Sequence, residues 1–438
     1  MFGISTRKPT VPPVVERMPA PFLCVVAPPE SLRDREGLDA LRRQLPDGRR
    51  CQVLGAAALV PADAARAQYV LALFCEPAQL DSLADAVLAA RADGAETVLV
   101  VATQPAQLTR LGGWLERRAG ANRLGGTRLL LATDLDGVAR QLGDRLQPVL
   151  EDNVIRMPIS TEIEDAGHRH LFLFSPSMHA LIARIRGYAL NGITRVCLLG
   201  GPGSGKTSFA YYYYLLRGQG RFVSVNLAAE NTGDKAAVKS LLCGHVSGAF
   251  PGAGARTGAF SHARDGVCFL DESHQISGAV MEVLMEALDN GQYLPYGASA
   301  KQSMECALLF ASNRGWEQLQ SAVNLDEFTR LGAAVLHVPP LAGREEDLIA
   351  VVATTLARLA SRCKSWVPPE GCTPEAWARL REARWHGNVR GLIRVLESAF
   401  VDTASQQAAG LIDAPAIEQG LMRWEPKSHH SHALYAAA

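Results

Sequence analysis

The alternation of apolar and polar residues along the chain predicts two successive units built from strands and helices. In both units, short apolar runs of strand length are separated by helical stretches, as expected for buried parallel strands. The runs lie at 22–27, 69–75, 97–102 and 128–132 in the first unit, and at 196–199, 222–226, 267–270 and 308–311 in the second. Each unit is therefore expected to be an α/β domain, with helices flanking a parallel sheet.

Changes in composition divide the chain further. Residues 1–20 contain four prolines and no periodicity, which indicates a flexible leader. The α/β units are assigned to 21–150 and 175–341, with a polar linker at 151–174, a helical subdomain at 342–410, and a short helix and disordered tail at 411–438. In the helical subdomain, Asn388 is expected to cap a helix whose apolar face carries Leu392, Leu396 and Phe400.

Composition excludes several broad classes of protein. The 44 Lys+Arg residues balance 44 Asp+Glu over 438 residues, so the overall charge gives no reason to expect nucleic-acid binding. The nine cysteines include no C-x-x-C pair, which indicates reduced, buried thiols. No apolar run approaches the roughly 20 residues that a membrane helix needs. These features predict a cytoplasmic protein with no membrane segment.

One glycine-rich segment has the pattern G-x-x-x-x-G-K-[ST] and lies between an apolar strand and a helical stretch. It comprises Gly200, Gly201, Pro202, Gly203, Ser204, Gly205, Lys206 and Thr207. Glycines allow backbone N–H groups to approach phosphate oxygens, and the helix that follows adds the positive end of its dipole. We expect Lys206 to reach the β- and γ-phosphates and Thr207 to bind Mg²⁺, which makes ATP the predicted cofactor.

Two carboxylates follow the apolar run 267–270. When found alone, such a pair is more often a helix cap or a solvated turn, but the preceding P-loop favours a catalytic role. Asp271 is expected to hold Mg²⁺ through water, and Glu272 to polarise the attacking water. Phosphoryl transfer depends mainly on such positioning of charge.

With these motifs in place, the residues from about 175 to 400 resemble the AAA+ domain of bacterial enhancer-binding proteins, the sigma-54-dependent transcription activators. The most specific match is Cys243-Gly244-His245 followed by the segment that resembles the family's sigma-54-contacting loop. That segment is Gly248, Ala249, Phe250, Pro251, Gly252 and Ala253. The resemblance implies a parallel α/β ATPase with a helical lid, a hexameric ring, and sigma-54 and RNA polymerase as partners. In motif detail it is similar to the activator of the RNA-terminal-phosphate cyclase operon.

The resemblance also implies roles for single residues. Asn226 matches the switch residue that holds the catalytic glutamate inactive, although a polar residue at a strand end is equally typical of a turn. Asn313 matches the sensor that orients water near the γ-phosphate, and Arg390 matches the lid arginine that senses nucleotide. Arg330 matches the arginine inserted into the neighbouring subunit's site, whereas Asn324 replaces a second arginine of the family.

Two departures from the family concern its partners. Pro251 replaces the threonine of the sigma-54-contacting loop, which removes a hydroxyl and a backbone donor. Only 38 residues follow Phe400, too few for the family's usual helix-turn-helix, so no DNA contact through this C-terminus is predicted. The leading hypothesis is a sigma-54 activator without its own helix-turn-helix, and the alternative is an AAA+ remodeller of another protein client.

The first α/β unit occupies the place of a sensory domain. A phosphorylated receiver needs acidic residues after its first strand and an aspartate ending its third, but Ala27 and Cys75 stand near these points. A receiver-like or Rossmann-like shape without phosphoryl chemistry is therefore expected. The arginines around Trp114 suggest either an anion or RNA site or, more often, a solvated helix face. They are Arg110, Arg117, Arg118, Arg123 and Arg128.

Overall fold

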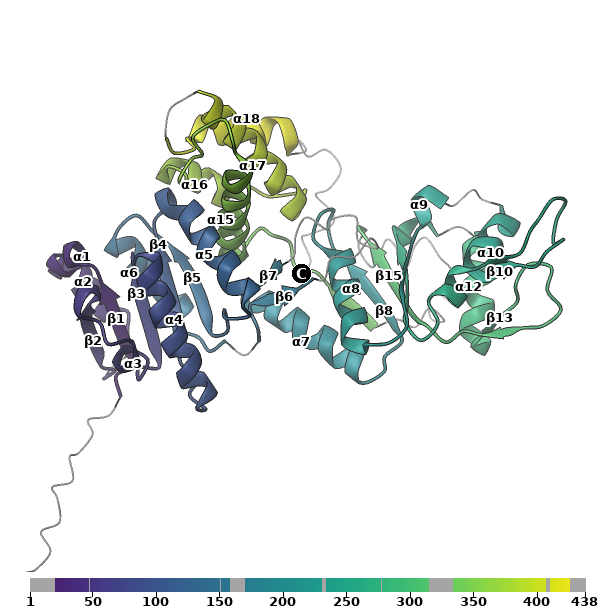
Figure 1. Cartoon of the computed structure of the whole chain (residues 1–438), viewed down its shortest axis with the longest axis horizontal. Coiled ribbons are helices and arrows are strands. Elements are labelled where there is room, and N and C mark those ends of the chain that lie inside the picture. Colours follow the sequence, from purple (N-terminus) through teal and green to yellow (C-terminus); the bar gives the residue numbers. More distant parts are fainter. Residues whose placement is uncertain are drawn as a thin grey trace, which may run out of the picture.

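The computed structural model describes residues 20–46, 48–149, 151–157, 170–230, 234–276, 278–314, 334–406 and 410–425. They form an N-terminal α/β domain, a second α/β domain and a helical lid. Figure 1 shows an elongated molecule in which the two α/β domains lie at opposite ends and the lid packs beside the N-terminal one. This arrangement confirms the predicted mixed α/β class with a helical lid.

The N-terminal domain contains a parallel sheet with strand order β2-β1-β3-β4-β5. Its strands are β1 (Leu23–Ala27), β2 (Cys51–Gly55), β3 (Tyr69–Leu73), β4 (Val98–Thr103) and β5 (Thr127–Leu131). Its helices are α1 (Pro29–Arg33), α2 (Arg35–Arg43), α3 (Pro61–Ala64), α4 (Pro77–Ala92), α5 (Leu108–Gly120) and α6 (Leu135–Arg145). This strand order is that of flavodoxin-like and receiver-like domains.

The second α/β domain contains a parallel sheet with strand order β16-β8-β15-β12-β9. Its strands are β8 (Arg195–Leu199), β9 (Phe222–Asn226), β12 (Val267–Asp271), β15 (Ala307–Ser312) and β16 (Ala334–His337). Its helices are α7 (Pro176–Leu190), α8 (Lys206–Arg217), α9 (Leu227–Glu230), α10 (Lys235–Cys243), α11 (Ala259–His262) and α12 (Gly278–Asn290). Alternate strand residues face two cores: α7 and α8 cover one face, and α10 and α12 cover the other.

Short hairpins extend this framework. β6 (Val154–Arg156) pairs antiparallel with β7 (His170–Phe172), so part of the expected linker 151–174 is a hairpin between the domains. At the far end of the second α/β domain, β10 (Gly244–His245) pairs with β11 (Arg256–Thr257), and β13 (Gln292–Tyr293) with β14 (Gln302–Ser303). Figure 1 shows that the loops of these two hairpins project beyond α10 and α12.

The lid consists of α15 (Glu345–Arg362), α16 (Pro374–Glu382), α17 (Asn388–Ser405) and α18 (Ala414–Trp424). The segment expected to stand apart at 411–438 contributes α18, which packs on α16 and α17 and buries Ile417 completely. Asp413 caps α18 by accepting from the backbone N–H of Ala416. The lid thus extends at least to residue 425 rather than ending at 410.

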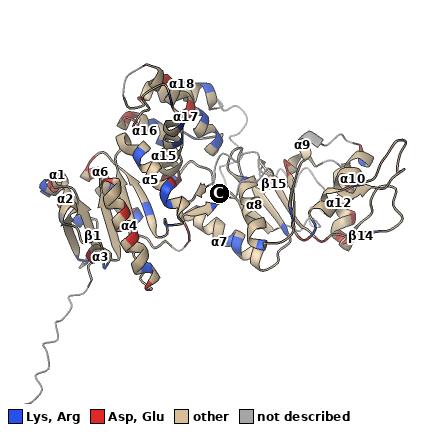
Figure 2. Ribbon diagram, viewed as in Figure 1, with Lys and Arg blue, Asp and Glu red and all other residues tan. Residues whose placement is uncertain are grey.

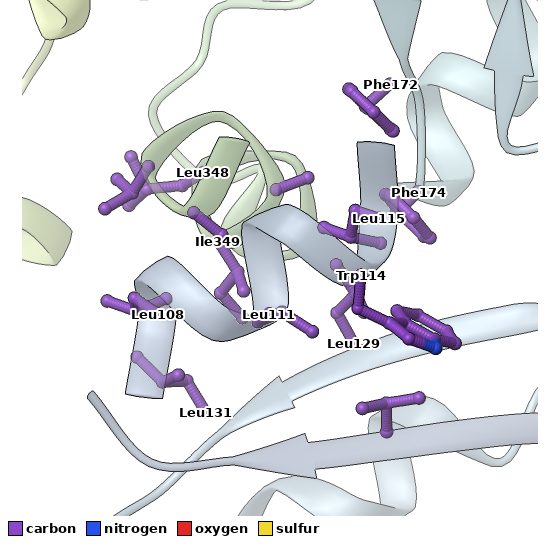
Figure 3. Close-up of a cluster of buried hydrophobic side chains, with 14 of the residues drawn as sticks. Leu108, Leu111, Trp114, Leu115, Leu129, Leu131, Phe172, Phe174, Leu348 and Ile349 are labelled. Atoms are coloured by element: carbon purple, nitrogen blue, oxygen red, sulfur yellow. The ribbon is translucent and has the colours of Figure 1, made fainter. Parts of the chain in front are cut away.

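The lid and the N-terminal domain share one hydrophobic core, which the sequence did not predict. Helix α15 lies along α5 and the edge strand β5, and Leu348 and Ile349 pack with Leu111 and Leu129 (Figure 3). The two helices approach so closely that a Cβ atom added to Gly112 would lie 1.9 Å from the carbonyl oxygen of Ala353. The N-terminal domain is therefore docked on the lid through a fixed, close-packed contact.

A buried ion pair reinforces this contact. The Arg128 guanidinium donates to both carboxylate oxygens of Glu346 at 2.6–3.1 Å, and both side chains are 3% exposed. Arg145 pairs with Glu345 at 3.1 Å beside them. Arg128 thus lies on β5 at the lid interface, so it belongs neither to a solvated helix face nor to an anion site.

The other arginines near Trp114 have acidic neighbours. Arg118 is buried and contacts Asp85 at 2.6 Å, while Arg117 contacts Asp81 at 3.6 Å. Figure 2 shows Lys and Arg interspersed with Asp and Glu over the N-terminal domain, the lid and the second α/β domain. These contacts argue against a dedicated RNA or anion surface here. Within the described ranges, no helix is both long and apolar enough to cross a membrane.

Candidate nucleotide site and the loop beyond it

The predicted site residues meet at the carboxyl edge of the second sheet. The P-loop follows β8, Asn313 follows β15, and Asp271 ends β12, and these three strands are neighbours in the sheet. The backbone N–H of Gly200 donates to Ser312 O at 3.1 Å, which fixes the start of the P-loop beside the end of β15. Ligands of open α/β sheets bind at this edge.

The P-loop is shaped by its glycines and by the start of α8. Gly203 and Gly205 have φ values of 68° and 95°, which residues with a side chain rarely adopt. Lys206 begins α8, and its Nζ donates to Gly200 O at 2.9 Å and to Gly201 O at 3.2 Å. Burial lowers the pKa of Lys206, while the charges of nearby carboxylates oppose the shift.

This arrangement fits a phosphate group. The N-terminus of α8 and the Lys206 ammonium provide positive charge at one place, and the loop leaves room for close backbone approach. The Ser204 hydroxyl oxygen is buried and has no hydrogen-bond partner among the described residues. Within the same ranges, no cluster of three His, Cys, Asp or Glu side chains forms a metal site. Thr207 in the first turn of α8 and Asp271 at the end of β12 are the residues that could hold Mg²⁺, which takes many of its ligands from water and phosphate.

The two carboxylates predicted to be catalytic lie at the end of β12 and in the turn that follows it. Asp271 Oδ1 accepts from the backbone N–H of Glu272 at 2.8 Å, and Glu272 has a φ of 53°. Ser273 anchors the turn, because its hydroxyl donates to Leu270 O at 2.8 Å and accepts from the N–H of Ala311 at 3.2 Å. The backbone of Glu272 is in the left-handed region and is held there by the turn that follows. Such strained conformations are often found at functional sites.

His274 is a neighbour of Glu272 that the sequence did not reveal. Its Nδ1 lies 3.3 Å from Glu272 Oε2, and its side chain is 9% exposed. Burial lowers the pKa of His274; Glu272 opposes this shift, and Arg314 adds to it. A histidine in a turn carries no sequence signal of its own, so only the fold brings it to this position.

Asn226 lies near the carboxylates, at the end of β9. The strand register places it opposite Asp271, and its side-chain Oδ1 accepts from the N–H of Ala228 at 2.9 Å. This hydrogen bond is the turn-forming arrangement weighed above, and it begins α9. The switch role of Asn226 stays a prediction.

The lid contacts the P-loop through the start of α17. Helix α17 begins at Asn388, and Gly387 takes the N-cap position that was expected for Asn388. The Asn388 side chain instead donates to Pro202 O at 3.0 Å and accepts from Leu341 N at 2.9 Å. A Cβ atom on Gly203 would lie 2.7 Å from the Cβ of Arg390. The lid arginine thus starts next to the P-loop, and its sensor role stays a prediction.

Arg330 and Asn324 lie outside the described residues. The roles predicted for Asn313 and Arg330 therefore rest on the sequence and, for Asn313, on its place after β15.

The segment Gly248 to Ala253 forms the tip of the β10–β11 hairpin, at the opposite side of the domain from the lid (Figure 1). Phe250 is 43% exposed, and its ring centroid lies 5.0 Å from that of His245 and 6.3 Å from that of Tyr296. The hairpin therefore presents an aromatic side chain on a surface loop supported by its neighbour.

Comparisons with known proteins assign this domain. Residues 171–337 match the sigma-54 interaction domain, and residues 342–433 match an AAA+ ATPase lid domain. Over these residues the chain is similar to sigma-54-interacting AAA+ ATPases. The matched sigma-54 interaction domain contains both the P-loop and the Phe250 hairpin, and the lid match includes α18.

Relatives of this AAA+ domain are transcriptional regulators. The alginate biosynthesis transcriptional regulatory protein AlgB of Pseudomonas putida is 29% identical over 71% of this chain and 69% of its own length. The DNA-binding transcriptional regulator NtrC of Bradyrhizobium sp. is 34% identical over 56% of this chain. The chain spans about half of that NtrC, 52% of its length.

The fold extends this likeness to the N-terminal domain. The crystal structure of NtrX from Brucella abortus in complex with ADP covers 94% of this chain and 87% of its own, with a TM-score of 0.50 and 18% identity. At that identity the likeness concerns the fold alone. In this chain Cys75 lies just beyond the end of β3, where its thiol contacts Val26 O at 3.5 Å and burial raises its pKa to about 12. A buried thiol beside an apolar strand does not provide the acidic pocket of a phosphorylated receiver.

Proposed function

We propose that the chain hydrolyses ATP with Mg²⁺ and uses the energy to remodel RNA polymerase holding sigma-54, thereby activating transcription. The observation that carries this proposal is the presence of a complete P-loop site and an exposed aromatic hairpin in one sigma-54 interaction domain. Both elements are fixed to the same sheet and its helices, so movement at the nucleotide has a structural route to the hairpin.

Each side chain has a specific role in this proposal. Residues Gly200 to Lys206 bind the phosphates, and Thr207 and Asp271 hold Mg²⁺. Glu272 positions the attacking water, with Asn313 orienting it and Asn226 or His274 controlling the glutamate. Arg390 joins the nucleotide state to the lid. Such positioning and charge stabilisation are what phosphoryl transfer requires.

The active form in this proposal is a homo-oligomeric ring, most simply a hexamer. Arg330 would then enter the neighbouring subunit's site, where an arginine typically raises the rate of phosphoryl transfer by about 10³–10⁵. The residues Gly248 to Ala253 would contact sigma-54. The likeness to the activator of the RNA-terminal-phosphate cyclase operon and the lack of a helix-turn-helix stay predictions.

Open-complex formation tests this function. Purified protein, sigma-54 RNA polymerase and promoter DNA are mixed with ATP, and DNA melting is followed by permanganate footprinting. We expect melting that requires ATP and is lost in Glu272→Gln, a near-isosteric change that removes the carboxylate charge. ATP hydrolysis without melting would contradict the sigma-54 assignment and indicate another protein client.

A further inference from the structure

The tip of the Phe250 hairpin is built from two consecutive β-turns. In the first, the N–H of Ala249 donates to Val246 O at 3.2 Å, and Gly248 at the third position has a φ of 78°. In the second, the N–H of Ala253 donates to Phe250 O at 2.9 Å, and Gly252 at the third position has a φ of 81°. Positive φ at the third position, without positive φ at Ser247 or Pro251 in the second position, is the pattern of a type II turn.

Pro251 occupies the second position of the second turn. Proline fixes φ at about −65°, which is the value that this position of a type II turn requires. The N–H at this position points away from the turn, so its absence removes no hydrogen bond of the turn. The backbone donor that Pro251 removes is therefore not needed by the turn.

The loop of the β13–β14 hairpin packs against this tip and supports it. The N–H of Val246 donates to Tyr296 O at 3.1 Å, and a Cβ atom on Gly297 would lie 2.8 Å from the Cβ of Ala249. The Phe250 ring rests near the rings of His245 and Tyr296 while remaining 43% exposed. The N–H of Gly248 also donates to Ala253 O at 2.9 Å, which ties the two turns together. The base of the loop is thus fixed by packing, and the tip residues 250–253 are held by this bond and by the conformation of their own turn.

We infer that Pro251 is a positioning residue, which holds the tip in a type II turn so that Phe250 is presented to sigma-54 in one preset orientation. This inference rests on the proposed function. The loop then recognises its partner through the Phe250 ring and the turn backbone, and no side-chain hydroxyl at position 251 takes part. Fixing the turn before binding lowers the ordering cost on docking.

The expected effects follow from the backbone. Replacing a proline whose conformation the chain already adopts gives the free loop more conformations, so more conformational entropy is lost on docking. The free-energy cost typically rises by about 0.4–1 kcal/mol, which is roughly two- to fivefold in the binding constant. Pro251→Ala and Pro251→Thr should both weaken the trapped complex with sigma-54 by about that factor. If the hydroxyl of the family's threonine mattered, Pro251→Thr would instead strengthen it.

Gly252 offers a matched pair of variants. A Cβ atom added there has no atom within 4 Å, so a substitution tests backbone conformation without a clash. Asparagine tolerates positive φ and valine does not. Gly252→Val should weaken the complex about tenfold or more, and Gly252→Asn much less. Gly254→Ala adds a methyl group in open space outside both turns and serves as the control.

The measurement is titration of sigma-54 into protein held with ADP and aluminium fluoride, read on native gels, with ATP hydrolysis measured in parallel for every variant. The inference is supported if the complex with sigma-54 weakens in Pro251→Ala, Pro251→Thr and Gly252→Val, while Gly254→Ala binds like the parent. A tighter complex with Pro251→Thr, or equal complexes with Gly252→Val and Gly252→Asn, would overturn it alone. A parent protein that hydrolyses ATP but forms no complex would refute the proposed function and this inference together.

Discussion

Replacing Arg128 with methionine removes one half of the buried ion pair that joins the N-terminal domain to the lid. The remaining Glu346 carboxylate is 3% exposed and keeps the N–H of Leu129 at 3.0 Å and the Arg145 guanidinium at 3.7 Å. Breaking a buried pair from one side typically costs about 3–5 kcal/mol. Because two partners remain, we expect a loss near the lower end, about 3 kcal/mol.

Differential scanning calorimetry provides the assay. For a unit of about 200 residues, each kcal/mol shifts the unfolding midpoint by about 2–4 °C, so Arg128→Met should lower it by roughly 6–12 °C. The control is Arg110→Met at the same interface. Arg110 pairs with Glu370 at 3.5 Å, but the two side chains are 49% and 67% exposed, and such pairs contribute at most about 1 kcal/mol.

The double variant Arg128→Met/Glu346→Met separates charge from packing. Replacing a buried ion pair with apolar side chains is often neutral, so the double variant should regain most of the lost stability. Equal midpoints for Arg128→Met and Arg110→Met would refute the reasoning, because the buried pair would then hold the domains no better than an exposed one.

Three further results are expected. Gly112→Ala should lower the unfolding midpoint because its methyl group meets the backbone of α15, whereas Gly113→Ala in the same helix, with its nearest atom 4.0 Å away, should be neutral or stabilising in the same scan. Thiol labelling with a water-soluble maleimide should modify the two half-buried cysteines, Cys51 and Cys363, and spare the seven buried ones; rapid labelling of all nine in the folded protein would contradict the described core. Burial lowers the pKa of His274, so the unfolded chain binds a proton there more readily and the free energy of unfolding falls as the pH drops below about 6.5. In urea titrations, His274→Asn should therefore lose less stability than the parent between pH 7 and pH 5.5. Equal losses would contradict this.

The sequence predicted the central strands because they are buried on both faces. β3 is apolar throughout and β4 is apolar except for its last residue, Thr103, and every residue of both strands is buried, so they stand out from their surroundings. The edge strands β2 and β16 were missed. β2 is half-exposed and mixes Gln52 with apolar residues, and β16 carries an exposed histidine, His337, so neither has the continuous apolar pattern of a central strand.

The P-loop motif and the carboxylates Asp271 and Glu272 could be singled out because phosphoryl transfer requires particular residue types at particular places along the chain. The partnership of Arg128 with Glu346 could not, because the two residues are 218 positions apart and each resembles ordinary surface charge. Asn388 was assigned to its helix from local pattern, whereas its side chain is used for contacts with the P-loop and Leu341. Local rules describe elements well but do not show which elements will meet.

Pro251 shows the same limit in a functional residue. From the sequence alone, Pro251 is a departure from the family that removes a backbone donor and a hydroxyl from the loop. The structure places it in the one turn position that suits proline, with Gly252 supplying the positive φ that follows. Its effect therefore depends on the turn type, which the residues predict only once the hydrogen bond from Ala253 to Phe250 is known.

The most direct test of the central claim is a trapped complex between this protein and sigma-54. Purified protein is incubated with sigma-54, ADP and aluminium fluoride, which together resemble the transition state of hydrolysis, and the mixture is separated on a native gel. We predict a stable complex that disappears in Phe250→Ala while that variant still hydrolyses ATP. Active ATPase rings that give no complex with sigma-54 would contradict the account.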